Sequence, residues 1–344
     1  MTAARPTPAW STVADADVVV VSGMHRSGTS FAARAIELLG VSLGRPEGLL
    51  APGSDNPAGY WENRAIQELD DELLAHLGGS WDHPPVLDPA WEDAADLAPF
   101  LDRAAAILDR DFAEAATRGP VGFKDPRVSI LLPFWRRVVP IRTTVVLVRD
   151  PRSVAASLAT RNMMGPPEAA VLWLRYLLAA TRDDPGHLLL THGSFFDDLD
   201  RTLERIADHL GGPAPTDAVR AGVREHLDPS LDHHGSGRTG RSGDENPLVA
   251  LALDVWNDGR PDVAAIDPTT AAGLARGWVR APADGEALAR ARAEAVSFKE
   301  QLKRRNEIVK ALKEGRPAPP PLPPTPVIDP DGAPGDTNRL DVVP

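Results

Sequence analysis

The fold is decided by the stretch Val18-Val19-Val20-Val21-Ser22-Gly23-Met24-His25-Arg26-Ser27-Gly28-Thr29-Ser30-Phe31. Four consecutive valines predict a strand buried on both faces, because a half-exposed strand would alternate apolar and polar residues. A polar loop bounded by Gly23 and Gly28 follows, and apolar residues at helical spacing predict a helix over Phe31–Leu39. A helix N-terminus after such a loop directs backbone N–H groups and the positive end of the helix dipole to one point. This stretch predicts an anion-binding loop, with a plain tight turn as the alternative.

The spacing of Gly23 and Gly28 is that of the loop that binds nucleoside triphosphates, but Thr29 stands where that loop has a lysine. The lysine serves the β- and γ-phosphates, so its absence argues against ordinary ATP or GTP chemistry. Arg26, inside the loop, indicates that a different anion is transferred.

Composition narrows the class of protein. The 344 residues are 42% hydrophobic and 25% charged, as in a soluble globular protein. A net charge of −12 argues against a general nucleic-acid-binding surface. The absence of cysteine excludes disulfides and thiolate catalysis and fits a cytoplasmic location. No apolar run approaches the length of a membrane span, residues 1–17 do not read as a secretory signal, and the histidines show no metal-binding spacing.

Strands that alternate with helices predict an α/β fold with a parallel sheet flanked by helices. Further strands are expected at Pro120–Lys124, Thr143–Val148 and His187–Thr191. Helices are expected at Ile66–Leu77, 96–117, Ile130–Val138, Ser153–Thr160, Ala169–Ala180, Leu199–Leu210 and 248–257. Ligands of parallel sheets bind beyond the carboxyl ends of the strands, so motifs at strand ends are expected to share one site.

The chain divides into four predicted parts. Residues 1–17 form a flexible leader, 18–283 the α/β domain, 284–315 a long C-terminal helix and 316–344 a proline-rich disordered tail. Apolar residues within 285–314 recur at heptad spacing. They predict a helix packed on the core or a coiled coil that forms a homodimer, and both interpretations stay open.

Arg149 and Ser157 form a second motif, in the run Arg149-Asp150-Pro151-Arg152 and the helix that follows it. An arginine at a strand end and a serine eight residues later, in the following helix, can bind one phosphate together. The alternative is that Arg149 caps the helix and Ser157 is an ordinary helical serine.

The third motif is Lys124-Asp125-Pro126-Arg127, at the end of a predicted strand. A lysine beside an anion-binding loop can stabilise negative charge on a leaving oxygen. The alternative is a surface turn in which Lys124 and Asp125 pair. Arg127 binds cofactor or acceptor, or only pairs with Asp125.

These motifs together resemble those of bacterial sulfotransferase-family proteins, which use PAPS (3'-phosphoadenosine 5'-phosphosulfate), and are similar to those of tyrosylprotein sulfotransferases. The resemblance covers about residues 18–235 and implies a P-loop-kinase-like parallel sheet. It implies that Arg149 and Ser157 hold the 3'-phosphate, while Arg26 and Lys124 neutralise the developing charge. The 5'-phosphosulfate would be held by His25, Arg26, Ser27, Gly28, Thr29 and Ser30.

The resemblance also has departures. The Arg-Lys-Gly-x-x-Gly segment by which cytosolic sulfotransferases cover the cofactor is not present, and the segment Gly237–Arg241 is a weak substitute. The C-terminal helix and the tail match nothing in the core pattern.

The residue that accepts the acceptor's proton is the least determined. Glu62 follows the aromatic pair Tyr60-Trp61 in a run that resembles a bacterial sulfotransferase signature, so Glu62 is expected to be the base. Glu47 is the second candidate, and Asp55 lies in the same segment. The alternative for Glu62 is that it only caps the following helix.

The expected function is metal-free, in-line transfer of a sulfuryl group from PAPS to a hydroxyl or amine. The acceptor would be a small molecule, a carbohydrate or a glycolipid, in a pocket shaped by Gly40–Tyr60 and the tryptophan-rich segment 80–95. A P-loop-type nucleotide kinase and a non-catalytic nucleotide-binding protein are the alternatives.

Overall fold

A four-stranded parallel sheet lies at the centre of the computed structural model, with the strand order β2-β1-β3-β4. Its strands are Val18–Gly23 (β1), Val121–Lys124 (β2), Ile141–Val148 (β3) and Leu188–Thr191 (β4). The structure describes residues 13, 16–53, 56, 59–88, 90–182, 186–227 and 247–257. The predicted α/β fold with a parallel sheet flanked by helices is confirmed.

β1 is buried by helices on both of its faces, which explains its unbroken run of valines. Each of Val18–Val21 is at most 1% exposed. Parallel pairing places Val21 beside Lys124 of β2 and beside Val145 of β3. The carboxyl ends of these three strands therefore lie at one edge of the sheet, where the three motifs of the sequence begin.

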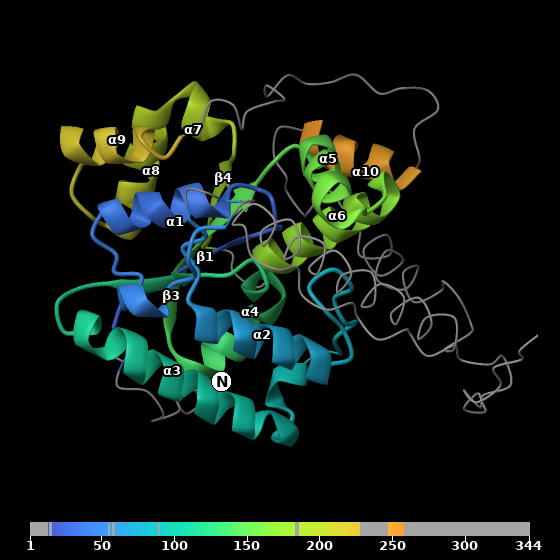
Figure 1. Cartoon of the computed structure of the whole chain (residues 1–344), viewed down its shortest axis with the longest axis horizontal. Coiled ribbons are helices and arrows are strands. Elements are labelled where there is room, and N and C mark those ends of the chain that lie inside the picture. Colours follow the sequence, from blue (N-terminus) through green and yellow to red (C-terminus); the bar gives the residue numbers. More distant parts are fainter. Residues whose placement is uncertain are drawn as a thin grey trace, which may run out of the picture. The chain divides into compact units, whose positions relative to one another are not determined.

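Helices cover both faces of the sheet (Figure 1). One face packs against Thr29–Leu38 (α1) and Leu199–Leu210 (α8), and Asp217–Arg224 (α9) packs on α1. The other face packs against Val128–Val138 (α4) and Pro166–Arg182 (α6), and Pro151–Asn162 (α5) and Pro247–Asn257 (α10) pack on α6. Arg64–His76 (α2) and Ala98–Ala116 (α3) pack together near β2. Alternating side chains of β1 thus enter different cores, and Val19 and Val21 belong to the one that contains α1.

The predicted helices up to residue 257 have counterparts in the structure, with boundaries that differ by a few residues. Ser194–Asp197 (α7) and α9 are additional helices that the sequence did not predict. Most of the predicted leader, the predicted helix 284–315, the tail 316–344 and the segment Gly237–Arg241 lie outside the described residues.

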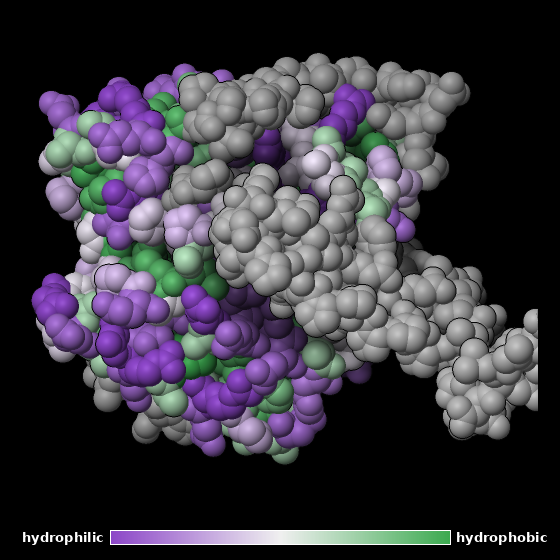
Figure 2. Space-filling model, in the orientation of Figure 1, coloured by the Kyte–Doolittle hydropathy of each residue, from purple (hydrophilic) through white to green (hydrophobic). Residues whose placement is uncertain are grey.

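The outer surfaces match an amphipathic pattern. Hydrophilic residues predominate over α2 and α3 on the face drawn in Figure 2. Their apolar residues, including Leu69, Leu73, Leu101 and Leu108, are buried. None of the helices in the described ranges is both long and apolar enough to cross a membrane.

Candidate functional site

The anion-binding loop joins β1 to α1 in a tightly packed turn. Gly23 has a φ of 129°, and a side chain there would collide with the carbonyl oxygen of Leu147 in β3. The Gly23 N–H donates to Ser129 Oγ at 2.9 Å. Gly28, with a φ of 86°, precedes the first residue of α1. The N-terminus of α1 therefore points to the carboxyl edge of the sheet, as an anion site requires.

A cavity of about 730 Å³ opens at this edge. The side chains predicted to be catalytic, Arg26, Glu62 and Lys124, line it. The residues predicted to bind cofactor also line it, with the exception of Ser27. Motifs from three strand ends thus converge on one space, as their positions in the sequence predicted.

Ser27 lies on the other side of the loop. Its side chain faces a void of about 10 Å³ beside Leu147 and Trp173, and its N–H donates to the Met24 carbonyl at 3.1 Å. The preceding residue, Arg26, has a φ of 69°, and this left-handed turn of the backbone separates the two side chains. The structure therefore brings Arg26 to the cavity and takes Ser27 away from it.

Arg26, Arg149 and Ser157 form one cluster. Arg26 Nε donates to Ser157 Oγ at 2.8 Å, and Arg149 Nη1 reaches the Arg26 carbonyl oxygen at 3.4 Å. The helix that carries Ser157 is capped by Asp150, whose side chain accepts from the Arg152 N–H at 2.8 Å. Arg149 is therefore not needed as a cap, and its guanidinium lines the cavity.

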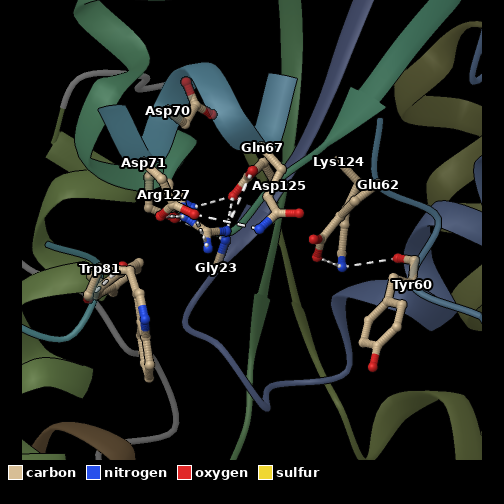
Figure 3. Close-up of polar contacts among 12 residues, drawn as sticks. Gly23, Tyr60, Glu62, Gln67, Asp70, Asp71, Trp81, Lys124, Asp125 and Arg127 are labelled. Atoms are coloured by element: carbon tan, nitrogen blue, oxygen red, sulfur yellow. Dashed lines mark hydrogen bonds and ion pairs between the residues drawn. The ribbon is translucent and has the colours of Figure 1, made fainter. Parts of the chain in front are cut away.

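Lys124 and Glu62 form a buried ion pair at the end of β2. Lys124 Nζ also donates to the Tyr60 carbonyl oxygen at 3.0 Å, and Figure 3 shows the ammonium between these two partners. The side chain of Asn63, rather than Glu62, caps α2 by accepting from the N–H groups of Ala65 and Ile66. Glu62 therefore does not cap α2, and its side chain contacts Lys124 on the cavity wall instead.

Arg127 belongs to a separate buried network. It forms ion pairs with Asp71 at 2.5 Å and Asp125 at 3.1 Å, as Figure 3 shows, and it does not line the cavity. Burial raises the pKa of Asp125 to about 6, although Arg127 opposes the shift. Lys124 and Asp125 are 2% and 0% exposed, so this motif is not a surface turn.

Glu47 is remote from this chemistry. It lies in the short turn Pro46–Gly48, its side chain is 76% exposed, and it does not line the cavity. Asp55 lies outside the described residues. Of the two candidate bases among the described residues, Glu62 lines the cavity and Glu47 does not.

His192 is a cavity residue that the sequence did not reveal. It directly follows β4, its ring contacts Phe31 and Phe196, and a side chain at Gly28 would lie 2.5 Å from its Cδ2 atom. Burial, assisted by Arg149, lowers its pKa to about 3, so the imidazole is neutral at pH 7. The rule that ligands bind beyond strand ends could have found it.

The acceptor region differs from the expectation. Of the described part of Gly40–Tyr60, Asn56 and Tyr60 line the cavity, whereas no described residue of 80–95 does. Trp81 lies behind the cavity wall and packs against His25, with 4.6 Å between the two ring centroids. Burial and nearby cations, first among them Arg127, lower the pKa of His25 well below its ordinary value.

No family model and no curated protein matches this chain. Solved structures with similarity include the sulfotransferase domain of an olefin synthase from Synechococcus PCC 7002, with 17% identity and a TM-score of 0.41 over 70% of this chain and 94% of that one. Sulfotransferase STF9 from Mycobacterium avium has 15% identity and a TM-score of 0.43, over 71% of this chain and 76% of that one. Mouse sulfotransferase SULT7A1 complexed with PAP has 14% identity and a TM-score of 0.32, over 83% of this chain and 88% of that one. The chain is similar in fold to these sulfotransferases.

Proposed function

We propose that the chain is a PAPS-dependent sulfotransferase that transfers a sulfuryl group to a hydroxyl or an amine. The observation that carries the proposal is that two elements suited to bind an anion line one cavity. One is the loop before α1 with Lys124 beside it, and the other is Arg149 with Ser157 on α5. A donor with separate 5' and 3' anionic groups needs such a pair.

The residues present fit this donor. Backbone N–H groups at the start of α1 suit the 5'-phosphosulfate, since a helix N-terminus favours anions. Arg149 and Ser157 offer a guanidinium and a hydroxyl, which suit the 3'-phosphate. Thr29 in place of the P-loop lysine disfavours a nucleoside triphosphate. In the described ranges, no cluster of three or more His, Asp or Glu side chains is placed to hold a metal ion.

PAPS supplies the sulfuryl group. The residues of the chain accept the proton of the acceptor and stabilise the negative charge that develops on the donor. Glu62 accepts the proton of the acceptor hydroxyl, whose oxygen forms the new bond to sulfur. The bond from sulfur to the bridging oxygen of the phosphosulfate breaks, and Lys124 stabilises the charge left on that oxygen. The products are a sulfate ester and PAP, the desulfated donor, with one proton released to solvent.

An indole on the cavity wall supports a choice of acceptor class. Trp61 lines the cavity, with the Arg34 guanidinium 5.0 Å from its ring centroid and His226 against its edge. Such a half-exposed indole can stack on a sugar ring, so a carbohydrate or glycolipid is the first acceptor class to test.

Calorimetry with PAP and with ATP tests the donor assignment. Wild-type protein is expected to bind PAP and not ATP, and Arg149→Ala is expected to weaken PAP binding by about 10- to 100-fold, the worth of a charged hydrogen bond. Arg118→Ala, at an exposed position just beyond the end of α3, is the matched control. Equal binding of PAP by wild type and Arg149→Ala would refute the 3'-phosphate assignment, and a preference for ATP would favour the kinase alternative. Transfer of label from PAPS to a panel of sugar acceptors then identifies the reaction.

A further inference from the structure

One face of α5 borders the cavity over its whole length. Residues at helical spacing, namely Ser153, Ala156, Ser157 and Thr160, line the cavity. Ser153 lies in the first turn, one turn before Ser157, so both hydroxyl groups lie on the same side of the helix. This first turn also carries backbone N–H groups without partners inside the helix and the positive end of the helix dipole.

The hydroxyl of Ser153 has no hydrogen-bond partner among the described residues. Ser153 is 3% exposed, and its Oγ atom is buried. By contrast, Ser157 Oγ accepts from Arg26 and Thr160 Oγ1 donates to the Ala156 carbonyl at 3.0 Å. A buried hydroxyl without a partner destabilises the fold, so an alanine would be the more stable residue at this position.

The surroundings of Ser153 favour an anion as the missing partner. Arg149 precedes the helix and lines the same cavity, and Arg26 reaches the neighbouring Ser157. The nearest carboxylate in the sequence, Asp150, is 7% exposed, is occupied with capping α5 and does not line the cavity. Two arginines and no carboxylate of this segment thus line the cavity beside the N-terminal half of α5.

We propose that Ser153 is an additional ligand of the donor's 3'-phosphate, held together with Arg149 and Ser157 at the N-terminus of α5. Two hydroxyls one turn apart and a guanidinium can bind different oxygens of one tetrahedral dianion. Ser153 is then a specificity-determining residue, because it helps distinguish a 3'-phosphorylated nucleotide from one that has a free 3'-hydroxyl. This inference rests on the proposed function and deepens it.

Ser153→Ala tests the proposal on the full chain, with two readouts that move in opposite directions. In the absence of ligand, the melting temperature is expected to rise by about 1–3 °C, because the variant no longer buries an unsatisfied hydroxyl. The dissociation constant of PAP, measured by calorimetry, is expected to rise about 10-fold. Thr181→Ala removes a hydroxyl that donates to the Leu177 carbonyl oxygen at 2.8 Å on α6, outside the cavity, and this control is expected to leave PAP binding unchanged.

The outcomes separate the inference from the proposed function. If Ser153→Ala binds PAP as wild type does, the inference is wrong, and a drop in melting temperature with unchanged PAP binding would assign Ser153 a structural role instead. If wild type fails to bind PAP, the proposed function fails, and inorganic phosphate becomes the probe. Thermal stabilisation by phosphate in wild type but not in Ser153→Ala would still support an anion site, and equal behaviour of the two would overturn it.

Discussion

The contact between Glu62 and Lys124 is costly to the fold. Both side chains are nearly buried, at 10% and 2% exposed, and taking two charges out of water consumes much of the energy that their attraction returns. Apolar residues of similar size in place of this pair would make the fold at least as stable. The pair lies on the cavity wall, where the proposed chemistry gives a reason for its presence that stability does not.

Glu62→Gln removes the proposed proton acceptor while it keeps the size of the side chain and an oxygen that can accept from Lys124. We expect kcat for sulfuryl transfer to fall by about 10²- to 10⁴-fold, the usual contribution of a general base. The dissociation constant of PAP should not rise, since glutamine leaves the charge of Lys124, beside the donor loop, without a competing carboxylate. Steady-state kinetics and calorimetry measure the two quantities.

Glu47→Gln is the matched control for this substitution. Glu47 is exposed and outside the cavity, so kcat should equal that of wild type. If Glu47→Gln were slow and Glu62→Gln normal, the choice of base would be reversed. Equal rates for wild type and both variants would exclude Glu62 and Glu47 as the base and leave Asp55 as the candidate of this segment.

Residues at predicted strand ends could be assigned to one site from the sequence. Arg26, Lys124 and Arg149 follow buried apolar runs, and parallel strands bring their ends together. The partners of these side chains could not be predicted. The contact between Arg26 and Ser157 depends on the left-handed backbone at Arg26, and Arg127 pairs with Asp71 across 56 positions of sequence. Local patterns do not encode such distant contacts.

At the scale of elements, the loop before α1 depends on how closely β1 approaches β3. Gly23 ends β1 with a φ of 129°, and a Cβ atom there would collide with the Leu147 carbonyl oxygen. That oxygen is part of the backbone of an inner strand and cannot move aside cheaply. The glycine therefore permits both the turn of the chain and the pairing of the two strands.

Gly23→Ala is expected to destabilise the protein by about 3 kcal/mol or more, because it adds a steric clash to the strain of a positive φ. Gly40→Ala is the matched comparison. Gly40 has a φ of 99°, but among the described residues no atom lies within 4 Å of the point that a Cβ atom would occupy, so the cost should be only about 1–2 kcal/mol. Urea unfolding measures both values. Equal destabilisation would show that backbone strain, and not the contact with Leu147, governs this position.

The elements that could be predicted are those with a strong apolar pattern. Val18–Val21 and Thr143–Val148 read as buried strands because both faces of the sheet are covered. α9 was missed because its one buried residue is Val223, too little apolar signal for a helix of eight residues. α7 has only four residues, fewer than periodicity can detect.

At the scale of the whole molecule, some of the acidic residues that give the chain its net negative charge are buried. Asp70 and Asp125 are fully buried, and Asp70 accepts a hydrogen bond from Trp135 Nε1 at 2.9 Å while its other oxygen has no partner among the described residues. Figure 3 shows Asp70 turned away from the network of Arg127. Burial, and next the charge of Asp125, raise the pKa of Asp70 well above its ordinary value.

The stability of the fold should therefore depend on pH through Asp70. From its ordinary value of 3.8 upward, the unfolded chain loses the proton that the native protein still holds. The native state thus binds more protons, and this contribution to the free energy of unfolding falls as the pH rises. Asp70→Asn keeps an acceptor for Trp135 but has no proton to lose. We expect its free energy of unfolding, relative to wild type, to increase as the pH rises above 3.8, the ordinary pKa of the carboxyl group. Asp102→Asn, exposed on α3, is the control and should show the same dependence of the free energy of unfolding on pH as wild type. Urea unfolding at several pH values measures this dependence. If it is the same for Asp70→Asn and wild type, Asp70 is ionised in the native protein.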